Sequence, residues 1–252
     1  MGGQKQGAGG QISVSSISLD AAEWTLAEQG PSENVFVNKA GDVVGVELRT
    51  EATAFRVDFD DLASLRSNIR HGFGGAGLIS ADVELFGGAN RPGADTAATA
   101  DATGHLEAAT GHPAAAPAIK GMAIITKLPQ IPHGMSYNGL IFLPFRDFSY
   151  SLYMRFEEVG VTGMRDAVIL DLLMQSGDVT VSTHTTPPII SGLSEDLYDP
   201  TLRGPLVRSK AEREEYDEKF PDHPLSKLRS CMRRVKQALI IDPVVMQAEQ
   251  GS

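Results

Sequence analysis

Two adjacent side chains in the last quarter of the chain could do acid–base chemistry. They are Asp222 and His223, and Tyr216 and Asp217 come shortly before them. A carboxylate can orient an imidazole so that the ring takes a proton from a substrate or from water. The pair is therefore the candidate catalytic site of a hydrolase. The alternative, which we favour, is that His223 caps a helix, because the next residue is a proline, which is common at the first position of helices.

The other histidines do not have the spacing of a metal site. The six histidines form no His-x-His and no His-Glu-x-x-His pattern, and Cys231 is the only cysteine. A metal site would have to be assembled from distant segments, so we expect neither a metal ion nor a cofactor. One cysteine cannot form an internal disulfide, which is typical of proteins in a reducing compartment.

The overall charge limits the partners. The chain carries 22 lysines and arginines against 32 aspartates and glutamates, a formal net charge of −10. A protein that grips nucleic acid over a broad surface needs a basic face, so we expect no nucleic-acid partner. No apolar run reaches the ~18 residues that a membrane-spanning helix requires, and the first residues lack the apolar stretch of a signal peptide. We therefore expect a cytoplasmic protein without a membrane span.

One predicted helix near the C-terminus is basic within this acidic chain. Its cationic residues are Lys227, Arg229, Arg233, Arg234 and Lys236. They could bind an anionic partner or a membrane surface. We favour a solvated face whose charges balance the acidic residues between positions 211 and 219.

The composition divides the chain into a body and flanking parts. Residues 1–11 are rich in Gly and Gln and predict a disordered tail. Residues 12–199 mix β-type and helical patterns, which predicts one α+β domain. Within it, residues 87–118 consist mostly of small and polar types and predict a flexible insertion. Residues 200–252 predict a helical extension packed on this domain.

Alternating segments predict a largely antiparallel, twisted sheet. The clearest pattern spans residues 147–158, where every second residue is apolar, so we expect one face of this strand to be buried. The residues on that face are Phe148, Tyr150, Leu152, Met154 and Phe156. Residues 134–143 form the other strand of the same hairpin. Residues 78–86 alternate as well. We expect one buried face there, formed by Ile79, Ala81, Val83 and Leu85.

Helical spacing predicts the elements around the sheet. Residues 62–73 follow two aspartates that can cap a helix. Residues 163–175 are apolar nearly all round, so we expect this helix to lie against the sheet and to be covered elsewhere as well. Residues 208–219 and 224–239 predict a C-terminal helical pair, and the second helix carries an apolar stripe. That stripe is formed by Leu225, Leu228, Met232, Val235 and Leu239.

Four motifs give the chain a resemblance to a known group. They are Gly134-Met-Ser-Tyr-Asn-Gly-Leu, Leu143-Pro-Phe-Arg-Asp-Phe-Ser-Tyr, Gly160-Val-Thr-Gly-Met-Arg-Asp-Ala-Val and Phe220-Pro-Asp-His-Pro-Leu-Ser-Lys-Leu-Arg. With them the chain resembles, over most of residues 18–236, an uncharacterised family of bacterial proteins. The order of elements is also similar to the Mog1/PsbP-like sandwich. That resemblance implies a sheet flanked by helices and a non-catalytic binding module, because some members of this fold act as adaptors in secretion or assembly.

Together these features favour a non-enzymatic protein-interaction or adaptor module. We expect a protein partner to bind a face of the sheet or the C-terminal helices. The candidate residues for binding a partner or ligand are Tyr137, Tyr150, Arg165, Tyr216 and Arg229. Two alternatives stay open. One is a hydrolase that uses Asp222 and His223, and the other is a small-ligand carrier with a pocket beneath the Tyr137/Tyr150 hairpin.

Overall fold

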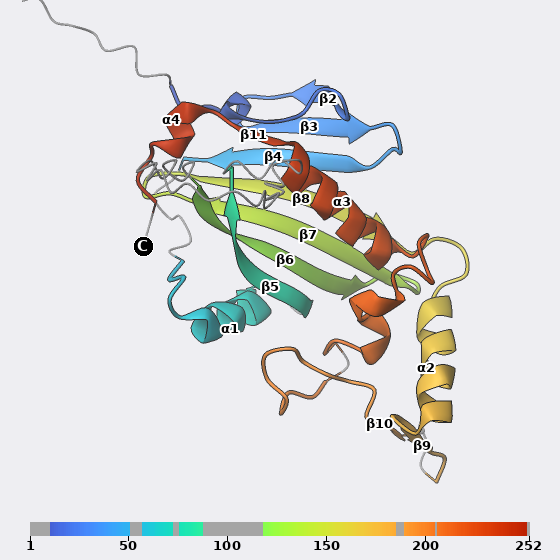
Figure 1. Ribbon diagram of the computed structural model, residues 1–252. Coiled ribbons are helices and arrows are strands. Elements are labelled where there is room, and N and C mark those ends of the chain that lie inside the picture. The colour runs from blue at the N-terminus through green and yellow to red at the C-terminus, as the bar shows by residue number, and fades with distance from the viewer. Residues whose placement is uncertain are drawn as a thin grey trace, which may run out of the picture.

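The computed structural model describes residues 11–50, 57–72, 76–87, 118–184, 189–204 and 206–250. The fold is mixed α+β and is built around one antiparallel sheet with helices on its faces (Figure 1). In spatial order the seven strands are β2 (Trp24–Gln29), β3 (Glu33–Asn38), β4 (Val43–Arg49), β8 (Ser149–Glu157), β7 (Met135–Pro144), β6 (Ile119–Pro129) and β5 (Gly77–Phe86). The predicted fold class is confirmed at this level.

One face of the sheet is covered by α3 (Pro224–Ala238), which crosses β7 and β8 (Figure 1). The predicted apolar stripe of this helix is confirmed, since Leu225, Leu228 and Val235 are fully buried. The helix lies very close to β7 at Gly139, where an added Cβ atom would stand 2.7 Å from Cδ1 of Leu228. Only glycine permits this approach.

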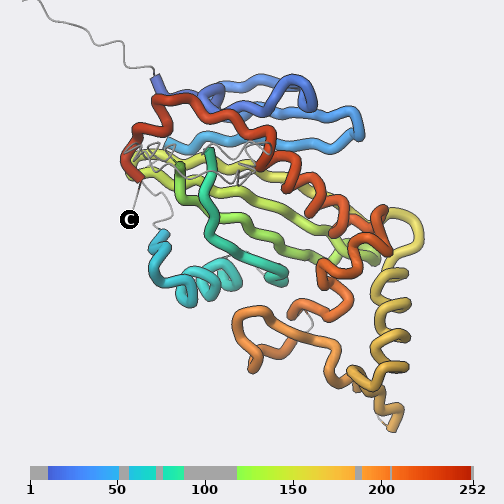
Figure 2. Tube along the Cα trace, viewed as in Figure 1, coloured from blue at the N-terminus to red at the C-terminus, as the bar shows by residue number. Residues whose placement is uncertain are grey.

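Two short strands extend the same layer. β1 (Ile17–Leu19) follows a 3₁₀ turn, η1 (Val14–Ser16), and pairs with β11 (Leu239–Ile241), which leaves the end of α3. Figure 2 shows the blue N-terminal segment running beside the red C-terminal one. A last short helix, α4 (Pro243–Met246), completes this edge.

The helix predicted at residues 62–73 exists as α1 (Leu62–Gly72), and it covers the opposite face of the sheet. The carboxylate of Asp61 accepts a hydrogen bond from the backbone N–H of Ser64, which caps the helix. Leu65 and Ile69 then pack on Met122 and other apolar residues of β5 and β6. Both faces of this part of the sheet are therefore apolar.

The predicted alternation of β8 is confirmed, but that of β5 is wrong. A bulge between Leu78 and Ser80 shifts the register of β5 against β6. As a result Ile79 belongs to the core under α3, whereas Leu78 and Ala81 pack under α1. Leu85 is 64% exposed instead of buried.

The helix predicted at residues 163–175 exists as α2 (Met164–Ser176), but its predicted place is wrong. It projects away from the sheet (Figure 1) and packs through Ile169 and Leu173 on Val179 and Ala211. A small hairpin of β9 (Thr180–Ser182) and β10 (Ile189–Ser191) lies beyond its C-terminal end. One side of α2 is therefore covered, and the other faces solvent.

Of the predicted C-terminal helical pair, the second helix exists as α3, but the first is wrong. Residues 208–219 form two 3₁₀ turns, η2 (Lys210–Glu212) and η3 (Glu214–Tyr216), instead of a helix. Ala211 and Glu212 are buried in these turns, against segments that are distant in the sequence. The predicted tail and the predicted insertion lie outside the described residues, apart from Gln11, Gly87 and Ala118. In the described ranges, no helix has the length and apolar character needed to cross a membrane.

Candidate functional site

A cleft of about 600 Å³ opens between the end of β8, the start of α2 and the connection from η3 into α3. We call it the His223 cleft. Phe156, Val161, Met164 and Pro221 are among its apolar lining residues, and His223 lies in its wall. This is the place where the structure brings the candidate catalytic residues to the surface.

His223 caps α3, as the sequence predicts. Its Nδ1 accepts a hydrogen bond of 3.2 Å from the backbone N–H of Leu225, and Pro224 occupies the first turn. The neutral ring therefore carries its proton on Nε2. That atom lies 3.6 Å from Oε1 of Glu158, and the ring stands edge-on to Tyr137 with the centroids 5.5 Å apart.

Burial and the nearby cations Arg165 and Arg229 together lower the pKa of His223 to about 4, although Asp217 opposes them. Asp222 does not offset this lowering of the pKa, because its side chain is 97% exposed and pairs with Lys227 at 3.5 Å. The carboxylate that faces the imidazole is Glu158 and not Asp222. A neutral, buried ring whose Nδ1 is already occupied is a poor general base at neutral pH.

Behind the cleft, Arg165 anchors the start of α2 in the interior. Its side chain is 1% exposed, and Nε and Nη2 donate to the carbonyl oxygens of Ala211 and Arg213, each at 2.7 Å. Nη1 donates to Oδ1 of Asp217 at 2.9 Å and to Oγ of Ser226 at 2.8 Å. Every nitrogen of this guanidinium therefore has an acceptor, which a buried arginine requires.

The same network reaches α3 and the sheet. Arg229 donates to Oδ1 of Asp217 at 2.9 Å and to the carbonyl oxygen of Glu212 at 2.7 Å. The carboxylate of Glu212 pairs with Lys127 of β6 at 2.7 Å and accepts a hydrogen bond from the hydroxyl of Tyr137 at 3.5 Å. We call these residues the Arg165 cluster, which comprises Lys127, Tyr137, Arg165, Glu212, Asp217 and Arg229. It ties β6, β7, α2, α3 and the two 3₁₀ turns together.

Asp166 lies beside this cluster and shares its environment. Burial raises its pKa to about 6, and the neighbouring carboxylates of Glu212 and Glu158 raise it as well, although Lys127 opposes them. A carboxyl group that titrates near neutral pH and has no catalytic partner points to a pH effect on stability.

The structure brings three of the five predicted binding residues together. Tyr137, Arg165 and Arg229 all belong to the Arg165 cluster. Tyr216 lies near its edge and packs with the apolar residues under α2. Tyr150 lies elsewhere, because its hydroxyl donates to the carbonyl oxygen of Ser13 at 2.6 Å inside the core under α3. Tyr137 and Tyr150 are both buried, and neither lines the His223 cleft.

Sequence reasoning missed Lys127, Glu158 and Glu212. One signal was present for Glu212, since Ser209 and Glu212 have the spacing of a capping box, and the structure contains that box. Lys127 lies near the end of β6 and Glu158 directly follows β8, and a charged residue in such a place normally indicates solvent. Their partners are distant in sequence, so no local pattern marks them.

The exposed side of α2 carries an apolar stripe. Met164, Val168 and Leu172 recur at intervals of four residues and are 57%, 45% and 42% exposed. We call these three residues the α2 stripe. Met164 also lines the His223 cleft, so the stripe and the cleft form one continuous surface. We take this surface as the candidate interaction site.

The basic face of α3 is largely neutralised by acidic residues, as the sequence predicts in part. Arg229 pairs with Asp217 and Arg233 with Glu214 within residues 211–219, whereas Arg234 pairs with Asp42 of the turn between β3 and β4. No group of three or more His, Cys, Asp or Glu side chains in the described segments is arranged to hold a metal ion.

Comparison of the chain with known protein families, with curated proteins and with solved structures finds no match.

Proposed function

We propose that the protein is a non-enzymatic adaptor that binds a partner protein along the α2 stripe and the His223 cleft. The observation that carries this proposal is the exposure of Met164, Val168 and Leu172 on one side of a helix whose other side is anchored. Burying one large aliphatic side chain stabilises a complex by about 1.5 to 3 kcal/mol. A partner that covers the stripe gains this free energy.

The Arg165 cluster supports the proposal because it fixes α2 before any partner arrives. Arg165 is the second residue of α2, and its hydrogen bonds join the helix to η2, η3 and α3. A surface that is already ordered loses little conformational entropy on binding. The Arg165 cluster therefore holds the binding surface in place and takes no part in a reaction.

The charges on α2 favour a basic, apolar partner segment. Asp171 is exposed on the same side as the stripe, whereas the one cation of α2, Arg165, is buried and paired with Asp217. The whole chain has a formal net charge of −10. We therefore commit to a partner helix with apolar residues at helical spacing and Lys or Arg on its flanks. A second copy of this chain fits less well, because it would bring like charges together.

The two alternative functions have less support. The hydrolase requires Asp222 to act on His223, but Asp222 pairs with Lys227 at the surface. The carrier requires a pocket at Tyr137 and Tyr150, but both side chains are packed in the interior. The adaptor function needs neither of these arrangements.

We also propose that the sheet belongs to the Mog1/PsbP-like sandwich and that the protein works in the cytoplasm. The antiparallel sheet with α3 on one face and α1 on the other supports the first proposal. The single, unpaired and buried thiol of Cys231 supports the second.

The test uses a labelled model peptide of leucine and lysine that forms an amphipathic helix. Its binding is measured by fluorescence anisotropy, beside a matched peptide in which glutamate replaces lysine. We expect the basic peptide to bind and the acidic one to fail. Val168→Asp and Leu172→Asp should each weaken binding by about tenfold or more, because each places a charge in the apolar contact.

The control variant is Leu197→Asp, which adds the same charge at an exposed leucine outside the α2 stripe. It should bind the basic peptide like the wild type. Equal loss in the control, or undiminished binding by Val168→Asp, would contradict the proposal. Sedimentation that shows a dimer lost in Val168→Asp would identify a second copy as the occupant instead.

A further inference from the structure

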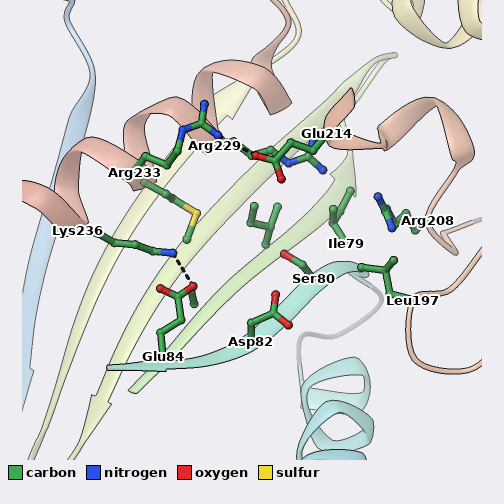
Figure 3. Close-up of a pocket in the computed structure, with 13 residues that line it drawn as sticks. Ile79, Ser80, Asp82, Glu84, Leu197, Arg208, Glu214, Arg229, Arg233 and Lys236 are labelled. Carbon is green, nitrogen blue, oxygen red and sulfur yellow. Dashed lines mark hydrogen bonds and ion pairs between the residues drawn. The ribbon is translucent and has the colours of Figure 1, made fainter. Parts of the chain in front are cut away.

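A second cleft, of about 260 Å³, lies on the α3 side of β5 and β6 (Figure 3). We call it the Arg208 cleft. Apolar side chains, among them Ile79, Ile125 and Met232, form one part of its lining. Charged residues of β5, η3 and α3 form the rest, and Arg208 extends into the cleft from the loop before η2 (Figure 3).

Every charged side chain on the wall of the cleft has a close partner, with one exception. Glu84 pairs with Lys236 at 2.6 Å and Glu214 with Arg233 at 2.9 Å. Asp82 accepts a hydrogen bond from the hydroxyl of Tyr198 at 3.2 Å. Arg229 belongs to the Arg165 cluster. The exception is Arg208.

Arg208 is buried, at 7% exposure, and its Nε has no hydrogen-bond partner among the described residues. The nearest carboxylate oxygen belongs to Glu195 and lies 3.8 Å from Nη1. That carboxylate is already engaged by Arg213, which donates to both of its oxygens at 2.8 and 2.6 Å. A buried guanidinium nitrogen without an acceptor costs free energy, so its retention requires a reason.

We propose that Arg208 binds the carboxylate of a small organic acid whose apolar body lies on Ile79, Ile125 and Met232. Guanidinium and carboxylate form two parallel hydrogen bonds, and the free donors of Arg208 supply them. The volume of the cleft limits the ligand to a small molecule. The acidic side chains Asp82, Glu84 and Glu214 disfavour a second negative charge, so the ligand is a monocarboxylate and not a phosphate.

This inference does not depend on the adaptor function, because the Arg208 cleft and the α2 stripe share no residue. The probes are 4-methylpentanoate and 3-phenylpropanoate, with their primary amides, glutarate and inorganic phosphate for comparison. Binding is followed by chemical-shift changes in amide NMR spectra. We expect both monocarboxylates to bind saturably. The amides, glutarate and phosphate should bind at least about tenfold more weakly.

The variants are Arg208→Leu and Arg208→Lys, with Arg49→Gln as the control outside the cleft. Arg208→Leu should abolish binding, and Arg208→Lys should weaken it about tenfold, because a lysine lacks the paired donors. Arg49→Gln should bind within about twofold of the wild type, since Arg49 is an exposed arginine of β4 that pairs with Glu47 and does not line the cleft.

Thermal unfolding without ligand separates a binding role from a structural one. Arg208→Leu should unfold at a higher temperature than the wild type, because it removes a buried charge that lacks acceptors. Absence of saturable monocarboxylate binding would overturn the proposal. Equal binding of the amides, tighter binding of phosphate, or loss of stability with unchanged probe binding in Arg208→Leu would overturn it as well.

Discussion

Arg165 of α2 and Arg229 of α3 donate to the same atom, Oδ1 of Asp217, and each distance is 2.9 Å. Both guanidinium groups are buried, so one carboxylate neutralises two cations in the interior. The position of α2 relative to α3 therefore depends on Asp217, a residue of the loop between η3 and α3.

Asp217→Asn should lower the free energy of unfolding by about 3 to 5 kcal/mol, because it leaves two buried cations without a counter-charge. Urea denaturation followed by circular dichroism measures the loss. The matched control is Asp222→Asn, five positions further on, where the side chain is 97% exposed and only a small change is expected. Similar losses in the two variants would show that the cluster does not hold the fold.

His223→Asn should stay within about 1 kcal/mol of the wild type at pH 7, because asparagine is also a good cap. At lower pH the two should diverge. The pKa of His223 is about 4 in the folded protein and 6.5 in the unfolded chain, so protonation favours unfolding between these values. The wild type should lose about 3 kcal/mol relative to the variant as the pH falls through this window. A constant difference from pH 7 to pH 4 would contradict the buried, neutral ring.

Asp166→Asn should have the opposite pH dependence. The pKa of Asp166 is raised from 3.8 to about 6, so the folded state holds a proton that the unfolded chain has already released. The wild type should therefore lose stability relative to the variant as the pH rises from about 4 to 6, by about 2 kcal/mol in total. Denaturation midpoints at several pH values measure this. A variant that is less stable than the wild type above pH 6 would contradict the assignment.

Leu152→Ala should cost about 2 to 5 kcal/mol, because the side chain is fully buried under α3 and its removal leaves a cavity. Ser151→Ala, on the neighbouring residue and the other face of β8, should cost well under about 1 kcal/mol. The two denaturation curves test the register of the strand directly. Equal effects would mean that the faces of β8 are assigned wrongly.

Local patterns predicted the elements whose partners follow from periodicity. The alternation of Phe148 to Phe156 identified the buried face of β8. The sequence before α3 predicted that His223 would cap the helix, because capping depends on a few neighbouring residues. Both signals are contained within one element and its immediate flank.

Long-range partners account for the errors. The apolar character of Met164 and Leu172 predicted burial against the sheet, but a solvent-exposed stripe has the same composition. The charges around Glu212 predicted a solvated helix, whereas Lys127, 85 positions earlier, pairs with Glu212 in the interior. The buried Nε of Arg208, which lacks a hydrogen-bond partner, likewise has no signature in the sequence. Whether this atom finds an acceptor depends on residues that are distant from it in the sequence.

The pairing of β1 with β11 has a consequence for how the chain folds during synthesis. Ile17 lies opposite Ile241, so a strand from the start of the described chain is completed by one from near its end. β1 and β11 cannot pair until the ribosome has synthesised β11. The part of the core beside Ile17 therefore stays uncovered until residues 239–241 have been synthesised.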